Sequence, residues 1–193
     1  MTAGARRVPE WLVYVVGALP APWLFWQGLT GGLGVEPITA LEHEYGRLAL
    51  QFLIAGLAIT PLFRLTGVNL VKFRRALGLL AFAYLVLHLL VWLLLDVQRL
   101  PQAWADIAKR PFITIGMVGF LLLIPLALTS TQKAIRRMGP KAWARLHKLV
   151  YLAAALGALH FVLVRKGIQY EPLIYAGILI GLLGLRFIGR RKA

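Results

Sequence analysis

The sequence predicts an all-α membrane protein, a six-transmembrane-helix bundle that forms a single domain over residues 1–193. Of these residues, 60% are hydrophobic, whereas soluble domains average roughly 45–50%. Apolar runs of about 20 residues are long enough to cross a bilayer. Six such runs follow one another, at residues 9–28, 45–64, 75–96, 111–130, 146–165 and 172–189.

The distribution of basic residues predicts that the N and C termini are both cytoplasmic. With six spans, sixteen of the 22 Lys and Arg residues fall on the side of the termini. These are Arg6, Arg7, Arg64, Lys72, Arg74, Arg75, Lys133, Arg136, Arg137, Lys141, Arg145, Lys148, Arg186, Arg190, Arg191 and Lys192. The other side holds six basic residues and six of the seven acids. This is the positive-inside pattern, so the net charge of +15 indicates topology and contact with anionic membrane lipids, and no nucleic-acid partner.

The first apolar run, 9–28, is interpreted as a helix and not as a cleaved signal peptide. It is long, contains Pro20 and Pro22, and is followed by no clear small-x-small cleavage site before the next loop. The loop at 28–37 is rich in glycine and ends in proline, which indicates a turn on the outer side. It lacks the strand and helix of a phosphate-binding loop, so no nucleotide site is predicted there.

Two other connecting segments carry local signals. Residues 96–111 are amphipathic, with Trp104 among charges, and are predicted to lie along the outer membrane interface. Residues 130–143 begin with the helix-capping pair Ser130 and Thr131 and break at Gly139, where the following proline suits the first turn of a helix. No soluble part is large enough to hold NAD or FAD, and the absence of cysteine excludes thiolate metal sites. Any electrons therefore reach and leave this chain on other molecules.

Three of the four histidines lie in apolar helices, where an ionisable residue is a functional hypothesis. They are His88, His147 and His160, while His43 lies at the outer start of the second helix. The alternative is that each buried imidazole only bonds a carbonyl across helices. The acids lie near helix ends, which disfavours a proton relay, and the histidines lie at different depths, which disfavours a zinc or copper site. Haem fits better, because one axial imidazole on each of two helices can hold it in a bundle core.

Counting residues gives the depth of each histidine. His147 and His160 are thirteen residues apart, or roughly 20 Å along a helix, so His147 is near the inner face and His160 near the outer one. His88 lies in the outer half of its helix and is predicted to share one haem with His160. Arg74 stands at the level of His147, where it is an unusual axial ligand but a good clamp for propionates. Thirteen residues turn an ideal helix about 140° away from the same face. His147 and His160 therefore either point in different directions from their helix, or the helix is distorted at Gly157.

Several stretches resemble one membrane family. They are RRALGLLAFAYLVLH at 74–88, LTSTQKAIRRMGPKAWARLHKLVYL at 128–152 and ALHF at 158–161. Shorter matches are GGLGVEP, HEYGR, AITPLFR, RPFITIG and EPLIYAG, at 31–37, 43–47, 58–64, 110–116 and 171–177. Together they cover nearly the whole chain in order. The sequence is similar to the ferric-reductase-like transmembrane domain family.

The resemblance implies a multi-pass protein of the bacterial inner membrane with one or two b-type haems and FMN. It implies electron transfer from a cytoplasmic flavin reductase or quinone to a periplasmic molybdopterin enzyme that reduces methionine sulfoxide. His88, His147 and His160 match haem-associated positions. Arg74 departs from the wider family, which has a histidine there, so the second ligand of an inner haem is left open.

The positions of basic residues and of His43 suggest further candidate site residues. FMN phosphate is expected on the basic inner surface, near Arg74, Arg75, Arg136 and Arg137. His43 and Arg47 are expected at the outer mouth, holding a propionate or orienting the partner, or else serving as interfacial anchors. The chain itself has no molybdenum or thiol site for methionine sulfoxide. Two alternatives remain: a ferric reductase or cytochrome b561-like quinol oxidoreductase with the same haem, and a scaffold or transporter without cofactor.

Overall fold

The computed structural model describes residues 8–164 and 169–188, and within these ranges it contains helices and no strand. The elements are α2 (Glu10–Ala18), α3 (Pro20–Leu29), α4 (Pro37–Thr66), η1 (Val71–Phe73), α5 (Arg74–Val91), η2 (Trp92–Val97), α6 (Leu100–Lys109), α7 (Pro111–Leu128), α8 (Gln132–Met138), α9 (Pro140–Leu146), α10 (Leu149–Val164) and α11 (Tyr170–Ile188). The predicted all-α class is confirmed.

Five stretches of the described chain are long and apolar enough to cross a membrane: Glu10–Leu29, Pro37–Thr66, Val71–Val97, Pro111–Leu128 and Pro140–Val164. They match the first five predicted runs. The sixth run corresponds to α11, a helix of 19 residues, so a sixth span and cytoplasmic termini stay predictions. The predicted helix ends at 165 and 189 lie outside the described residues. So do Arg6, Arg7, Arg165, Lys166, Arg190, Arg191 and Lys192.

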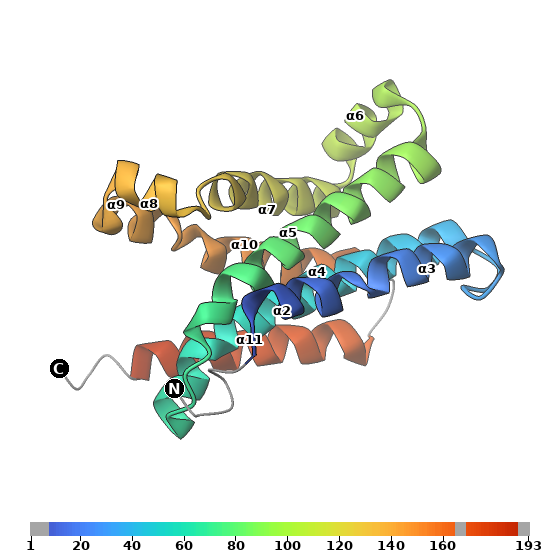
Figure 1. Cartoon of the computed structure of the whole chain (residues 1–193). Coiled ribbons are helices and arrows are strands. Elements are labelled where there is room, and N and C mark those ends of the chain that lie inside the picture. Colours follow the sequence, from blue (N-terminus) through green and yellow to red (C-terminus); the bar gives the residue numbers. More distant parts are fainter. Residues whose placement is uncertain (1–7, 165–168, 189–193) are drawn as a thin grey trace.

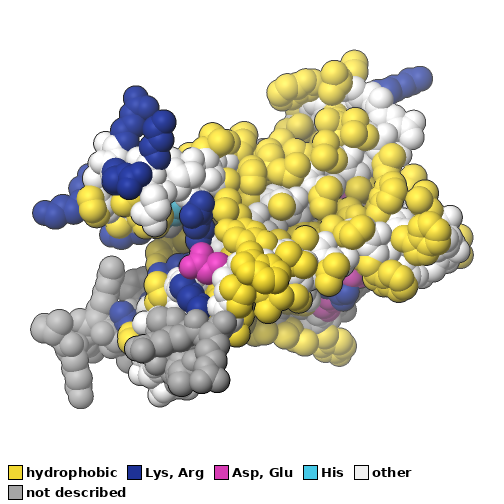
Figure 2. Space-filling model, viewed as in Figure 1, with side chains coloured by type: hydrophobic (Ala, Val, Ile, Leu, Met, Phe, Trp, Pro, Cys, Tyr) yellow, Lys and Arg dark blue, Asp and Glu magenta, His cyan; other side chains and the backbone are white. Residues whose placement is uncertain are grey.

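The bundle is organised around α4 and α5, which pack along each other, while α10 packs against α7 and α11 (Figure 1). The start of α2, the α4–α5 connection, the α8–α9 pair and the end of α11 lie at one end (Figure 1). Lysine and arginine side chains gather there over α8 and α9, and the rest of the visible surface is mainly hydrophobic (Figure 2). We call this the inner end and the opposite one the outer end, after the predicted orientation.

The second helix is longer than predicted. Hydropathy places its start at residue 45, but α4 begins at Pro37, and Pro lies in its first turn. The added residues include Glu42 and Glu44, which lower the hydropathy without interrupting the helix. His43 and Arg47 therefore lie inside a regular helix, where α4 fixes their direction.

The first span is interrupted where α2 ends and α3 begins at Pro20, a residue that cannot donate a helical hydrogen bond. Two buried tyrosines dock this span onto the bundle. The hydroxyl of Tyr84 donates to the carbonyl of Gly17, and that of Tyr45 to the carbonyl of Ala21, both at 2.8 Å. The first span is therefore attached to α4 and α5 by polar contacts.

The two connecting segments form the predicted local structures. The hydroxyl of Thr131 caps α8 by accepting from the backbone N–H of Ala134 at 3.1 Å. Gly139 separates α8 from α9 with φ of 80°, a conformation that suits glycine. In α6, Ala103 is buried and Trp104 is exposed, so the helix is amphipathic as predicted.

Candidate functional site

His88 and His160 lie next to each other on the wall of a cavity near the outer end. His88 comes from α5 and His160 from α10, and their ring centres are 6.2 Å apart with an angle of 78° between planes. A cavity of about 90 Å³ lies beside them, and α4 and α7 complete its walls. The depth match predicted by counting residues thus corresponds to two adjacent rings.

Each of the two rings donates a hydrogen bond to a backbone carbonyl on a neighbouring helix. Nδ1 of His88 is 2.9 Å from the carbonyl oxygen of Glu42, and Nδ1 of His160 is 2.8 Å from that of Phe112. A carbonyl oxygen only accepts, so the proton of each neutral ring is on Nδ1 and the lone pair is on Nε2. These bonds agree with the carbonyl-bonding alternative, but they also leave both rings with a nitrogen able to bind a metal.

The same local pattern supports both histidines. Each carbonyl acceptor is followed, one helical turn later, by a glycine: Gly46 after Glu42 and Gly116 after Phe112. A Cβ atom at Gly46 would be 3.1 Å from Nδ1 of His88, and one at Gly116 would be 2.8 Å from Nδ1 of His160. The missing side chains therefore make room for the imidazoles to reach the helix backbone.

The outer cavity fits a haem iron better than a bare metal ion. Metal–imidazole bonds of roughly 2 Å, with about 1 Å from each nitrogen to its ring centre, separate two axial rings by about 6 Å, close to the observed 6.2 Å. A hydrogen bond from the other ring nitrogen to a carbonyl is the usual support for a metal-binding histidine. Among the described residues no group of three His, Cys, Asp or Glu side chains is placed to hold a metal ion alone.

The cavity is smaller than the ~300–1,000 Å³ of typical ligand pockets, so a bound macrocycle requires the surrounding helices to move apart. Gly119 of α7 and Gly157 of α10 line the wall opposite α4. A Cβ atom at either position would make contacts of 3.6 Å or longer. Neither glycine is therefore required by a close contact, in contrast to Gly46 and Gly116.

His43 and Arg47 also line the outer cavity, with Glu42. Arg47 forms ion pairs with Glu44 and, at 3.4 Å, with Glu171 at the start of α11. Its Nε atom is buried and has no hydrogen-bond partner in the described structure. The two residues expected at the outer mouth thus both lie on the wall of this cavity.

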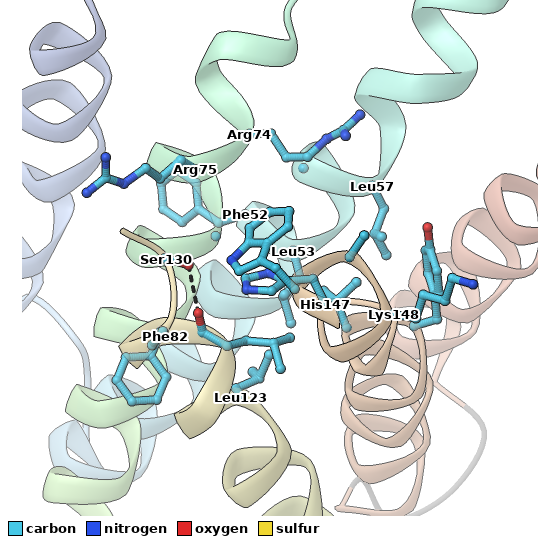
Figure 3. Close-up of a pocket in the computed structure, with 18 of the residues that line it drawn as sticks. Phe52, Leu53, Leu57, Arg74, Arg75, Phe82, Leu123, Ser130, His147 and Lys148 are labelled. Carbon is cyan, nitrogen blue, oxygen red and sulfur yellow. Dashed lines mark hydrogen bonds between the residues drawn. The ribbon is translucent and has the colours of Figure 1, made fainter. Parts of the chain in front are cut away.

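A second, larger cavity of about 540 Å³ lies near the inner end, between α4, α5, α7, α8, α9, α10 and α11. Figure 3 shows His147 near the centre of this cavity, with Arg74 above it and Leu123 below. Arg75 lines it as well. The described residues of its wall include several cations and no Asp or Glu, so the cavity favours an anionic ligand.

His147 is held at a break between helices. It follows the last residue of α9, and α10 begins at Leu149, so the helix is interrupted at His147, whereas α10 continues through Gly157. The ring stacks on Trp143 with centres 3.9 Å apart. Its Nε2 is 3.0 Å from the hydroxyl of Thr129. No second histidine among the described wall residues faces it.

The basic residues expected around a phosphate are only partly brought together. Arg74 and Arg75 line the inner cavity, whereas Arg136 and Arg137 are exposed on α8, whose wall contribution is Gln132 and Ile135. Sequence reasoning assigned no role in the site to two other cations of the wall, Lys148 and Arg186. Arg186 belongs to the last turn of α11. The sequence had already placed it on the inner side of the membrane, and this was the one indication that it could reach the inner cavity.

The two cavities are separated by a thin apolar wall. Leu53 of α4 and Leu123 of α7 line both of them. Phe82 lines the inner cavity and Phe120 the outer one, and their rings lie nearly parallel with centres 5.9 Å apart. The two cavities are thus neighbours along the bundle, and the layer between them consists of these apolar side chains.

Comparison with known proteins identifies the family of the chain. The family described as ferric reductase like transmembrane component matches residues 44–158. The protein-methionine-sulfoxide reductase heme-binding subunit MsrQ of Agrobacterium fabrum is 50% identical over 179 residues, which are 92% of this chain and 83% of that protein. Subunits of the same name from Brucella anthropi and Brucella ovis are 48% and 49% identical, covering 92% and 90% of this chain and 81% and 79% of theirs. No solved structure matches the chain.

Proposed function

The chain belongs to the ferric reductase like transmembrane component family, and we propose that it is the haem b electron-transfer subunit of a methionine sulfoxide reductase system. It would accept electrons at the inner end and deliver them at the outer end to MsrP, a periplasmic molybdopterin reductase. The membrane is the bacterial inner membrane. The chain itself does not act on methionine sulfoxide.

The adjacent pair His88 and His160 is the observation that carries the proposal. Both rings have Nδ1 engaged by a carbonyl and Nε2 unprotonated, with ring centres 6.2 Å apart. Haem b, when bound, supplies reversible one-electron chemistry at its iron. The carbonyls of Glu42 and Phe112 fix the orientation of the rings and raise the basicity of Nε2. Arg47 and His43 would provide cationic and polar groups for the acidic groups of the haem.

The inner cavity is the proposed point of electron entry. It takes FMN, or a second haem with His147 as one ligand, and Arg74 and Arg75 attract the acidic groups of either cofactor. A cytoplasmic flavin reductase or membrane quinone would supply the electrons. The apolar layer between the two cavities would exclude water and keep the distance between the two cofactors short. It consists of Leu53, Leu123, Phe82 and Phe120.

The test is reconstitution of the purified full-length protein with MsrP, a flavin reductase and NADH, with methionine sulfoxide as the substrate. We expect reduction to require the wild-type membrane subunit, and the subunit to show a haem b spectrum on dithionite reduction. His160→Ala should abolish both signals, while Lys109→Gln, a charge change on the exposed face of α6, should leave them intact. A colourless wild type, or turnover that persists in His160→Ala, would refute the proposal. Reduction of ferric chelates without transfer to MsrP would favour a ferric reductase.

A further inference from the structure

Two arginines from different helices meet at the inner end, and neither has a carboxylate partner among the described residues. Arg74, at the start of α5, donates to the hydroxyl of Thr60 on α4 at 2.7 Å. Arg186, near the end of α11, donates to the same hydroxyl at 3.3 Å and to the carbonyl of Leu57 at 2.7 Å. It also donates to the hydroxyl of Tyr151 and lies over that ring, 4.9 Å from its centre.

Every acceptor in this cluster is uncharged. The ion pairs of the described structure involve Arg47 and Arg110 and neither of these arginines. Two guanidinium groups on one hydroxyl repel each other, and the repulsion is screened less beside apolar helices than in water. The Nε of Arg186 is, in addition, buried without a hydrogen-bond partner in the described structure. The cluster therefore lacks a negative charge and has an unused donor.

The position of the cluster indicates where that negative charge belongs. Arg74, Arg186 and Tyr151 all line the inner cavity of about 540 Å³, so the cluster belongs to the wall of a space large enough for a cofactor. Arginine binds carboxylate and phosphate oxygens through two parallel hydrogen bonds. Lys148, on the same wall, adds a further positive charge.

We propose that Arg74 and Arg186, bridged by Thr60, form an anion subsite that binds the acidic group of the cofactor in the inner cavity. The group is a phosphate or a carboxylate, that is, the phosphate of FMN or a haem propionate. This inference rests on the proposed function for the identity of the cofactor. It assigns to α11 a direct role in binding, because Arg186 brings the end of that helix into the site.

The experiment compares FMN with riboflavin, which has the same ring system and no phosphate. Flavin fluorescence titrations and haem per polypeptide are measured on the full-length wild type, Arg74→Gln, Arg186→Gln and Arg64→Gln. Arg64 is the matched control, because it lies one turn after Thr60 on α4, is exposed, and is absent from the cavity wall. Arg74 has Thr60 as its hydrogen-bond partner and is exposed, so its replacement spares the contacts that hold α11.

If the subsite binds the flavin phosphate, the wild type prefers FMN over riboflavin by at least tenfold, and Arg74→Gln and Arg186→Gln each remove most of that preference. Riboflavin affinity and the Arg64→Gln control stay unchanged. If it binds a propionate, both variants instead speed haem transfer to apomyoglobin at least tenfold, and flavin preference is unchanged. Variants that match wild type and Arg64→Gln in both measurements would overturn the inference. A colourless wild type that still prefers FMN would reject the proposed function and retain the subsite.

Discussion

Gly116→Ala is expected to displace His160 and weaken haem binding at the outer cavity. The added Cβ would lie 2.8 Å from Nδ1 of His160, and an ordinary contact begins at 3.4 Å, so the ring must retreat by about 0.6 Å. That movement breaks or lengthens the 2.8 Å hydrogen bond from Nδ1 to the carbonyl of Phe112. Leaving a buried donor without a partner costs about 1–3 kcal/mol.

A cost of this size corresponds to a loss of haem affinity of about 5–150-fold, a range that includes the roughly 10–100-fold loss usually seen when a partner of a metal-binding histidine is removed. The assay is haem per polypeptide in detergent, together with the rate of haem transfer to apomyoglobin. Gly46→Ala should displace His88 in the same way but by less, because its Cβ would lie 3.1 Å from Nδ1 of His88. Gly177→Ala on α11 is the control, since a Cβ there meets nothing within 4 Å.

The graded order is the part of this prediction that is easiest to refute. Equal haem retention in Gly116→Ala and Gly177→Ala would show that the contact between α7 and His160 does not position the ring. A larger loss in Gly46→Ala than in Gly116→Ala would show that steric distance to Nδ1 does not control binding. Either result would remove the physical basis for assigning the two glycines a positioning role.

Three further changes test other parts of the structure. Thr129→Val removes the hydroxyl 3.0 Å from Nε2 of His147. It should weaken flavin binding by about 1 kcal/mol, roughly fivefold, without altering the spectrum of the outer haem. Unchanged flavin affinity would show that the His147 ring does not need this hydrogen bond. Arg47→Gln breaks the partly exposed ion pairs with Glu44 and Glu171. It should lower the free energy of unfolding by about 1 kcal/mol or less, and the difference from wild type should shrink at high salt. A difference in melting temperature that does not depend on salt would contradict the ion-pair explanation. Thr131→Ala removes the cap of α8 and should cost about 1 kcal/mol, seen as faster hydrogen exchange at the Ala134 amide, and an unchanged exchange rate would contradict it.

Hydropathy and residue counting predicted much of this structure because both depend on regular helix geometry. Apolar runs identified the five stretches of the described chain that are long enough to cross a membrane, and a fixed rise per residue placed His88 and His160 at one level. The start of α4 was missed because hydropathy marks the hydrocarbon segment, whereas the helix extends to Pro37 through polar residues. The break at His147 was also missed, since Gly157 appeared the easier place to distort a helix.

The contacts that orient the site were not predictable from side-chain patterns. The acceptors for His88 and His160 are backbone carbonyls, which every residue has, so the sequence does not single out Glu42 or Phe112. The glycine one turn after each acceptor was visible in the HEYGR and RPFITIG motifs, but its purpose required the packing of the helices. Arg186 joins the inner cavity through the packing of α11 against α4 and α10, a long-range arrangement that spacing along the chain does not encode.

The most direct test of the central claim is haem stoichiometry and the low-spin electron paramagnetic resonance signal in His88→Ala, His160→Ala and the double variant. If the two histidines hold one haem between them, each single variant loses the same low-spin signal and the same amount of haem, and the double variant loses no more. The near-perpendicular rings also predict the large g anisotropy of crossed axial imidazoles in the wild type. If instead the single variants lose different haem signals and the double variant loses the sum, His88 and His160 do not share an iron and the account is wrong.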